Sequence, residues 1–129
     1  MKAAIIGLGV GEKHLETLNK INFITKIKIY DLNFLKAKKI GKKYSKAIAC
    51  KNINEIYNDA DIKLACVASY DSSHFNQIKK FLERNINVFA EKPVVTKLNE
   101  AKKIFNILKK KNYFSEQIIF LESLKDLLI

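Results

Sequence analysis

Three glycines near the start of the chain have the types and spacing of a loop that binds a nucleotide. Gly7, Gly9 and Gly11 form the stretch GLGVG, directly after a short apolar run. In the motif G-x-G-x-x-G, the first glycine permits a tight turn, the second lets the backbone approach a pyrophosphate, and the third lets a helix pack closely on a strand. Here the third glycine comes one position early. The loop therefore fits a dinucleotide, S-adenosylmethionine or a simple turn.

Asp31 ends the second apolar segment and fits either nucleotide ligand. Both ligands carry an adenosine ribose whose hydroxyl groups a carboxylate can accept as hydrogen bonds. The same side chain could instead cap the helix that follows. A methyltransferase loop normally has an acidic residue two positions before its first glycine, and Ile5 stands there. This substitution disfavours a methyltransferase.

The elements that must position these residues alternate along the chain without repeats or a linker. Predicted strands cover residues 3–6, 25–31, 46–50, 62–69, 86–93 and 114–124. Predicted helices cover residues 12–21, 33–44 and 53–60, a segment capped by Ser72 or Ser73 that runs to 84, and a segment capped by Thr96. The last helix has an apolar stripe of Leu98, Ala101, Ile104, Phe105 and Leu108.

Six strands that alternate with helices predict an α/β fold, a Rossmann-like doubly wound parallel sheet, because parallel neighbours need crossover connections. Such sheets bind ligands outside the carboxyl ends of the strands, where the strand order reverses. Residues 7–11, Asp31, residues 69–72 and residues 91–93 should then lie along one edge. At 129 residues the whole chain is expected to be one dinucleotide-binding domain, residues 1–129.

The net charge of +11 raises the question of a nucleic-acid partner. The charge is spread, about +7 in residues 1–60 and about +4 in the remainder. Arg84 is the single arginine among 24 basic residues, and aromatic residues are not interleaved with the lysines. The composition favours a lysine-rich solvated surface over a specific nucleic-acid site.

Cys50 and Cys66 lie in apolar surroundings and outside metal-ligand spacing, so we expect two core thiols, no metal site and a reducing cytoplasm. The apolar run at residues 3–10 is too short for a secretion signal and lacks a cleavage site. No run approaches the length needed to span a membrane. A cytoplasmic protein without a membrane partner is the expectation.

The stretch from Ala68-Ser69 through the loop YDSS, His74 and a helix to Glu91-Lys92-Pro93 resembles the glucose-fructose oxidoreductase, inositol dehydrogenase and MocA (Gfo/Idh/MocA) family of NAD(P)-dependent oxidoreductases. Family members also tend to carry a histidine shortly after the glycine loop, and His14 matches it one residue early. The resemblance covers nearly the whole chain. Glu-Lys-Pro after a strand is its most specific part.

The resemblance implies a role for each matching position. Lys92 would lie beside nicotinamide and substrate as the catalytic residue, where an ammonium polarises the oxygen of the reacting carbon or takes part in proton transfer. Asp31 would bind the ribose and favour NAD over NADP, because a carboxylate repels the 2′-phosphate. The complete set of implied cofactor-binding residues is Gly7, Gly9, Val10, Gly11, Asp31, Ser69, Asp71, His74, Glu91, Lys92 and Pro93. His14 and His74 would either contact the cofactor or be ordinary residues of a first helical turn.

Two departures from the family pattern bear on function. Glu12 stands where the third glycine is expected and could place a carboxylate near the pyrophosphate. Family members continue into a second α/β domain that binds a sugar or polyol, and this chain ends where that domain would begin. The expected function is the cofactor half of an oxidoreductase that acts on a sugar, cyclitol or sugar derivative. A non-catalytic NAD-binding module, a truncated remnant, a subunit completed by another chain and a homo-oligomer remain open.

Overall fold

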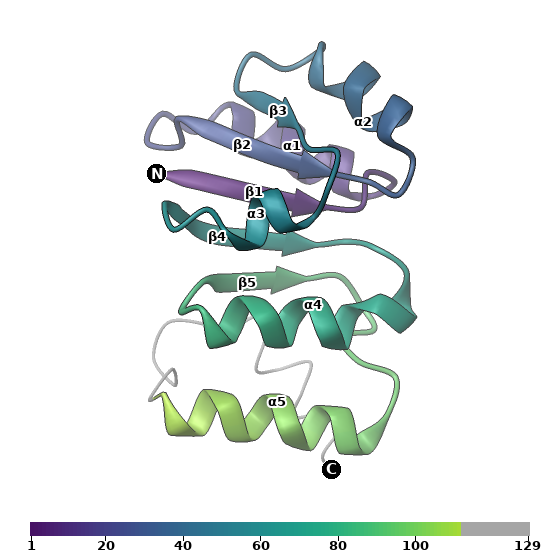
Figure 1. Ribbon diagram of the computed structural model, residues 1–129, viewed down its shortest axis with the longest axis vertical. Coiled ribbons are helices and arrows are strands. Elements are labelled where there is room, and N and C mark those ends of the chain that lie inside the picture. Colours follow the sequence, from purple (N-terminus) through teal and green to yellow (C-terminus); the bar gives the residue numbers. More distant parts are fainter. Residues whose placement is uncertain (112–129) are drawn as a thin grey trace.

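The computed structural model describes residues 1–111, which form a parallel sheet covered by helices on both faces (Figure 1). The strands are β1 (Lys2–Ile6), β2 (Lys26–Tyr30), β3 (Ala47–Ala49), β4 (Ile62–Val67) and β5 (Asn87–Ala90). Their order is β3-β2-β1-β4-β5, and all four pairings are parallel. The predicted Rossmann-like sheet is confirmed with five strands, and the predicted strand at residues 114–124 lies outside the described part.

Strand β1 occupies the centre of the sheet because its side chains can be buried on both faces. Ala3 and Ile5 belong to one core cluster, and Ala4 and Ile6 belong to the other. Successive side chains of a strand point to opposite faces, so a continuous apolar run fits only a strand covered on both sides. The run directs the glycine loop to the middle of the carboxyl edge.

Five helices accompany these strands, of which the first four fill the crossovers and the fifth follows β5. They are α1 (Gly11–Asn19), α2 (Phe34–Gly41), α3 (Asn54–Tyr57), α4 (Asp71–Glu83) and α5 (Leu98–Lys110). Buried residues of α1 and α2 belong to one core cluster, whereas those of α3, α4 and α5 belong to the other. Figure 1 shows α5 beyond α4 at the end of the molecule, with its axis alongside that helix. Each face of the sheet therefore has its own helical layer.

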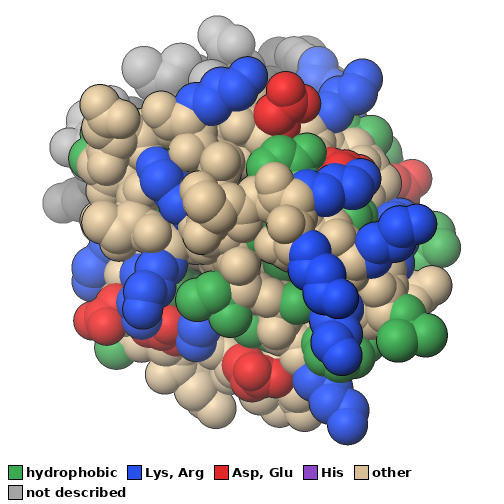
Figure 2. Space-filling view, turned by 90° about the horizontal axis from the view of Figure 1, so that it is seen from above, with side chains coloured by type: hydrophobic (Ala, Val, Ile, Leu, Met, Phe, Trp, Pro, Cys, Tyr) green, Lys and Arg blue, Asp and Glu red, His purple; other side chains and the backbone are tan. Residues whose placement is uncertain are grey.

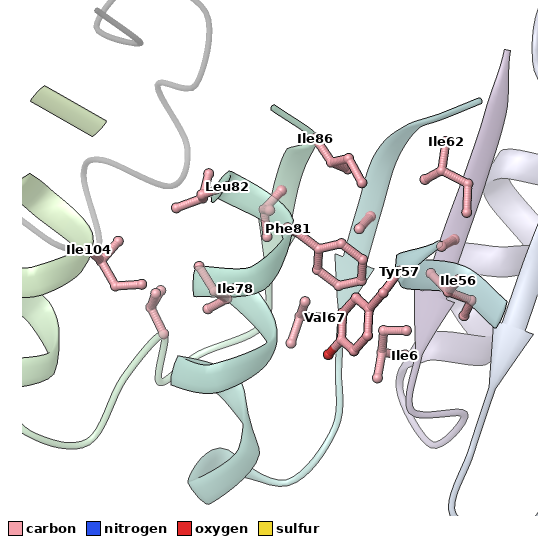
Figure 3. Packing of buried hydrophobic residues seen from close by; sticks show 14 of the residues in the cluster. Ile6, Ile56, Tyr57, Ile62, Val67, Ile78, Phe81, Leu82, Ile86 and Ile104 are labelled. Atoms are coloured by element: carbon pink, nitrogen blue, oxygen red, sulfur yellow. The ribbon is translucent and has the colours of Figure 1, made fainter. Parts of the chain in front are cut away.

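The larger core cluster joins α3 to α4 on the same face of the sheet. Figure 3 shows Phe81 of α4 against Tyr57 of α3, and their ring centroids are 5.0 Å apart. Burial raises the pKa of the Tyr57 hydroxyl to about 12, so the phenol stays protonated. Lys80 and Arg84 approach the same ring, with the Lys80 Nζ 4.9 Å from its centroid. These contacts fix the face of α4 that packs against α3.

The predicted helix caps at Ser72, Ser73 and Thr96 are wrong. Helix α4 begins at Asp71 with Tyr70 as its N-cap residue, and α5 has Lys97 at that position. Neither the side chain of Tyr70 nor that of Lys97 forms a capping hydrogen bond with the backbone of its helix. Since α4 starts earlier than the hydroxyl pattern indicated, both serines lie inside its first turn. Their hydroxyls become available to the opening beside the glycine loop.

Within residues 1–111, none of the helices is long and apolar enough to cross a membrane. The same residues contain no group of three or more histidine, cysteine, aspartate or glutamate side chains that could hold a metal ion. Both cysteines are buried and unpaired, as the sequence predicted. Burial raises the pKa of Cys66 to about 12 and that of Cys50 to about 11, so neither thiol is a reactive thiolate.

Candidate functional site

The carboxyl edge of the sheet brings three loops side by side at the point where the strand order reverses. Gly7 donates its backbone N–H to the Tyr30 carbonyl at 2.8 Å, which continues the pairing of β1 with β2. The Ala68 N–H donates to Ile6 at 2.8 Å, and the Glu91 N–H donates to Val67 at 2.9 Å. The three segments that follow β1, β4 and β5 are therefore tied together by backbone bonds just past the strand ends.

Gly7 is required by the backbone itself. Its φ of +88° lies in the region that favours glycine, and a Cβ there would lie 2.5 Å from the Ala68 carbonyl oxygen. The backbone of the glycine loop thus passes directly over the end of β4. Gly9 differs, because a Cβ at that position would meet nothing within 4 Å. The space around Gly9 is open and can admit a ligand close to the backbone.

Gly11 performs the packing role of a third glycine although it comes one residue early. It is the first residue of α1, and a Cβ on it would lie 3.0 Å from the Ile5 side chain and 3.4 Å from that of Ala68. The helix can approach the sheet closely only because this side chain is absent. Val10 precedes it as an exposed N-cap residue without a side-chain cap bond.

The Asp31 carboxylate links the glycine loop to the start of α2. One oxygen accepts the Leu8 N–H and the other accepts the Asn33 N–H, each at 2.9 Å. Asn33 is the N-cap residue of α2 and accepts the Lys36 N–H at 3.1 Å. Asp31 therefore does not cap α2 directly, and it lies beside the loop with further lone pairs available for a ligand hydroxyl.

A cavity of about 570 Å³ opens beside the glycine loop on the face of the sheet that carries α3 and α4. Ile6, Gly7, Leu8 and Gly9 form one wall, and Asp31, Leu32, Asn33 and Lys36 form the wall beneath the β2 end. Residues from the β4 end and α4 close the other side. Lys36 and Lys80 are the basic groups of this lining and Asp31 is its acid. The volume and the slight excess of positive charge suit an elongated ligand with phosphate groups.

Four of the predicted cofactor residues line this cavity and the others do not. Gly7, Gly9, Asp31 and Ser69 are in the lining. The predicted residues outside it are Val10, Gly11, Asp71, His74, Glu91, Lys92 and Pro93. The structure thus places four of the predicted residues at an opening that can hold a nucleotide, and three others, Glu91, Lys92 and Pro93, in a separate segment after β5.

The cavity also has a polar wall on α4 that the sequence analysis missed. Ser72, Ser73, Asn76, Gln77 and Lys80 all face it. Ser72, Asn76 and Lys80 are four residues apart, and Ser73 and Gln77 repeat that spacing, which places them on one side of a helix; the sequence contains this signal. Ser69 donates its hydroxyl to the Gln77 side-chain oxygen at 2.6 Å, so the loop after β4 is fastened to this wall.

Glu12 does not point into the opening. Its carboxylate pairs with Lys43 at 3.2 Å and accepts a hydrogen bond from the Tyr44 hydroxyl at 3.4 Å, both beyond the end of α2. It is not part of the cavity lining. The expectation that the shortened loop could place a carboxylate beside a pyrophosphate is therefore not supported, because α1 directs Glu12 toward α2.

The second part of the edge is the segment of residues 91–93 after β5. Glu91 is partly buried, whereas Lys92 and Pro93 are exposed and joined by a cis peptide bond. Val94 and Val95 then enter the core. His14 of α1 contacts the Glu91 carboxylate, and His74 of α4 contacts the Pro93 carbonyl. Lys92 thus stands at the carboxyl edge with side chains from two helices beneath it.

Basic side chains cover much of the surface outside the site. Figure 2 shows Lys and Arg side chains spread over the upper face of the molecule, with acidic side chains among them. Most of this charge does not belong to the cavity, whose basic residues are Lys36 and Lys80.

Comparison with known proteins gives a consistent picture. The Gfo/Idh/MocA model, described as an oxidoreductase family with an NAD-binding Rossmann fold, matches residues 1–116. YhhX of Escherichia coli strain K12, an uncharacterized oxidoreductase, is 38% identical over 68 residues, which are 53% of this chain and 20% of that protein. Inositol 2-dehydrogenase of Salmonella typhimurium strain LT2 is 26% identical over 126 residues, which are 94% of this chain and 37% of that protein.

A solved structure has the same fold. Myo-inositol dehydrogenase from Lactobacillus casei, in complex with NAD(H) and myo-inositol, superposes with a TM-score of 0.76 at 24% identity. The match covers 85% of this chain and 33% of that one. The chain therefore spans well under half the length of the relatives that it matches.

Proposed function

The chain belongs to the Gfo/Idh/MocA family of oxidoreductases with an NAD-binding Rossmann fold, and on that premise we propose that it holds NAD along its carboxyl edge for hydride transfer. The observation that supports this most is the cavity at the reversal of strand order. Open backbone at Gly9 lies on one side of it, and the carboxylate of Asp31 lies on another. These are the positions at which a Rossmann sheet meets a pyrophosphate and a ribose.

The backbone and the residues around the cavity would hold the adenosine half. The N–H groups of residues 9–11 lie at the start of α1, where the helix dipole favours phosphate. Asp31 would accept a ribose hydroxyl while it keeps its bonds to Leu8 and Asn33. Tyr57 and Ile53 also line the cavity. We propose NAD over NADP, because an added 2′-phosphate would meet the Asp31 carboxylate.

Lys92 is the proposed catalytic residue. Hydride transfer at nicotinamide C4 is the chemistry that the cofactor supplies when bound. In the direction of reduction, the ammonium of Lys92 would donate a hydrogen bond, and then a proton, to the oxygen of the carbon that receives the hydride. In the opposite direction the proton of the substrate hydroxyl would pass to a base as hydride leaves the carbon. Two named relatives act on inositol, so we propose a hydroxyl-bearing carbon of a cyclitol or sugar as the reacting group.

Calorimetric titration of the purified chain with NAD, NADP and S-adenosylmethionine tests the binding proposal. We expect NAD to bind more tightly than NADP and S-adenosylmethionine to give no heat. Asp31→Ala should weaken NAD binding, and Lys92→Ala should not, because Lys92 lies outside the cavity. Preferential binding of NADP would overturn the proposed role of Asp31, and absence of binding by both dinucleotides would overturn the cofactor site.

Turnover is a separate question from binding. The chain can be mixed with NAD and a panel of cyclitols and sugars, and formation of reduced nicotinamide followed by absorbance. Reduction that disappears in Lys92→Ala supports an oxidoreductase with Lys92 in the chemistry. NAD binding without reduction for every member of the panel would favour a binding module, the second function that the sequence left open.

A further inference from the structure

Both histidines of the chain reach the same short segment from opposite sides of the sheet. His14 is the fourth residue of α1, and His74 is the fourth residue of α4. These helices belong to different core clusters and cover opposite faces of the sheet. Nevertheless His14 contacts Glu91 and His74 contacts Pro93, the two neighbours of Lys92. A shared target for two distant side chains calls for a common explanation.

His14 holds the side chain of Glu91. Its Nε2 lies 2.5 Å from a Glu91 carboxylate oxygen, and its ring meets the edge of Phe89 with centroids 5.1 Å apart. The two side chains are 26% and 33% exposed, so the hydrogen bond is partly shielded from water. The Phe89 contact fixes the plane of the imidazole ring. The ring can then direct one nitrogen at the carboxylate.

His74 holds the backbone of the same segment and of the neighbouring loop. It is 1% exposed and is the buried polar residue of the described core. Its Nδ1 lies 2.7 Å from the Pro93 carbonyl oxygen, and its Nε2 lies 2.9 Å from the Ser69 carbonyl oxygen. A neutral imidazole ring donates to one carbonyl at a time, and a doubly protonated ring donates to both. The ring lies between the loop after β4 and the segment after β5, and it donates to one of them when neutral and to both when doubly protonated.

Lys92 has no such anchor of its own. Within residues 1–111 no ion pair or hydrogen bond of its ammonium is present, and the residue is exposed. Its position is therefore set by the backbone of residues 91–93. That backbone is held at one end by the Glu91 N–H bond to Val67 and at the other by the buried side chains of Val94 and Val95. The two histidines restrain the stretch between these fixed points.

We infer that His14 and His74 are positioning residues that clamp residues 91–93 and thereby fix where Lys92 projects, and that neither is a cofactor ligand. The catalytic meaning of this clamp rests on the proposed function. Neither histidine lines the cavity. His74 has both ring nitrogens directed at backbone carbonyls, and the Nε2 of His14 is directed at a protein carboxylate, so a ligand that binds any of these three nitrogens would have to displace its partner.

Variants that keep or remove one hydrogen bond test the clamp in the cofactor-free chain. Glutamine carries an amide near the place of the histidine Nε2, so His14→Gln can still donate to Glu91, whereas His14→Ala cannot. Asparagine carries an amide near the place of Nδ1, so His74→Asn can still donate to Pro93, whereas His74→Ala cannot. The readouts are the backbone amide signals of Glu91 and Lys92 by nuclear magnetic resonance and hydrogen exchange of the same amides.

We expect His14→Ala to shift these signals and to raise exchange at Glu91 and Lys92 by roughly tenfold, because local opening becomes easier. His14→Gln should restore both readouts nearly to those of the unmodified chain. His74→Asn should keep the signals of Glu91 and Lys92 close to native while it shifts those near Ser69. If His74→Ala fails to fold, the His14 pair and His74→Asn still decide the question.

Calorimetry on the same proteins separates the clamp from the cofactor site. The inference is overturned if His14→Ala leaves the Glu91 and Lys92 signals unchanged, or if His14→Gln behaves like His14→Ala. It is also overturned if His14→Ala weakens NAD binding more than about tenfold, a factor expected for loss of a ligand contact. Failure of the unmodified chain to bind NAD would count against the proposed function alone, since the clamp is read without cofactor.

Discussion

The glycine loop and the Glu91–Pro93 segment lie on the same edge of the sheet but are built in different ways. Gly7 takes its place through backbone geometry, since its φ is positive and its α-carbon lies against the backbone of Ala68. Lys92 takes its place through contacts of its neighbours with histidines from α1 and α4. The first region is therefore sensitive to a side chain added at Gly7, whereas the second is sensitive to the loss of particular hydrogen bonds.

The difference suits the two tasks that we propose for these regions. A pyrophosphate is bound by backbone N–H groups, so a loop must come close to the ligand and small residues are needed. A catalytic ammonium must be held in one direction, so hydrogen bonds beneath its backbone are needed. Substitutions in the loop and elsewhere can therefore be distinguished by their separate effects on NAD affinity and on stability.

Gly7→Ala should have the largest effect. The new Cβ would lie 2.5 Å from a backbone oxygen in a conformation that alanine rarely adopts, so the loop must move away from β4. We expect the free energy of unfolding to fall by at least about 2 kcal/mol and NAD affinity to fall by more than about 100-fold. Thermal unfolding and calorimetry measure the two effects.

Gly9→Ala is the matched control for that prediction. Its Cβ would meet no protein atom within 4 Å, so the melting temperature should stay within about 2 °C of the native value. NAD binding should still weaken, because the methyl group occupies space that we assign to the ligand. If Gly7→Ala and Gly9→Ala destabilised the chain equally, the backbone account of the loop would be wrong.

Asp31→Asn should have the next largest effect on binding. The amide keeps one acceptor oxygen for either Leu8 or Asn33 and presents N–H groups to the other, so one of the two 2.9 Å bonds is lost. We expect NAD affinity to fall by roughly 10- to 100-fold, as for a hydrogen bond to a charged group. Asp61→Asn is the control at an exposed carboxylate outside the cavity, and it should change affinity by less than about threefold.

Asp59→Asn should reduce stability while leaving the cofactor site intact. Asp59 accepts from Lys28 at 2.9 Å and from Lys2 at 3.1 Å. Its hydrogen bond with Lys28 is the main reason that its pKa falls from 3.8 to about 2. A depressed carboxyl pKa stabilises the folded state above pH 4, and this contribution disappears as the pH falls from about 4 to about 2.

We therefore expect Asp59→Asn to lower the free energy of unfolding by about 1–2 kcal/mol at pH 7 and to have less effect below pH 2. Chemical unfolding across this pH range is the measurement. NAD affinity at neutral pH should stay within about twofold of native, because Asp59 is not part of the cavity lining. A large loss of affinity would mean that NAD binding follows global stability.

Lys92→Ala should have the smallest effect on binding. The residue is exposed and outside the cavity, so we expect NAD affinity within about twofold and a melting temperature within about 2 °C of native. Lys97→Ala, an exposed lysine beyond the segment, is the matched control in both measurements. A clear loss of affinity only in Lys92→Ala would give Lys92 a part in cofactor binding and not in chemistry alone.

Much of the fold could be predicted from local pattern. The apolar run before Gly7 and the alternation of strands with amphipathic helices predicted a parallel sheet, and the described part confirms it with five strands. The third glycine comes one position early, and the structure shows that Gly11 still allows α1 to pack closely on Ile5. The predicted caps of α4 were wrong because Asp71, Ser72 and Ser73 follow one another at its start. The local pattern does not show which residue begins the helix.

The sequence by itself determined where the chain turns and which residues can occupy the carboxyl edge, because glycine geometry and apolar periodicity act between near neighbours. Only the tertiary structure decided that Glu12 turns away to Lys43, that α4 supplies a cavity wall, and that His14 and His74 meet residues 91–93. These contacts join positions far apart in the chain. They depend on strand order and helix packing, which bring together side chains that are distant in the sequence.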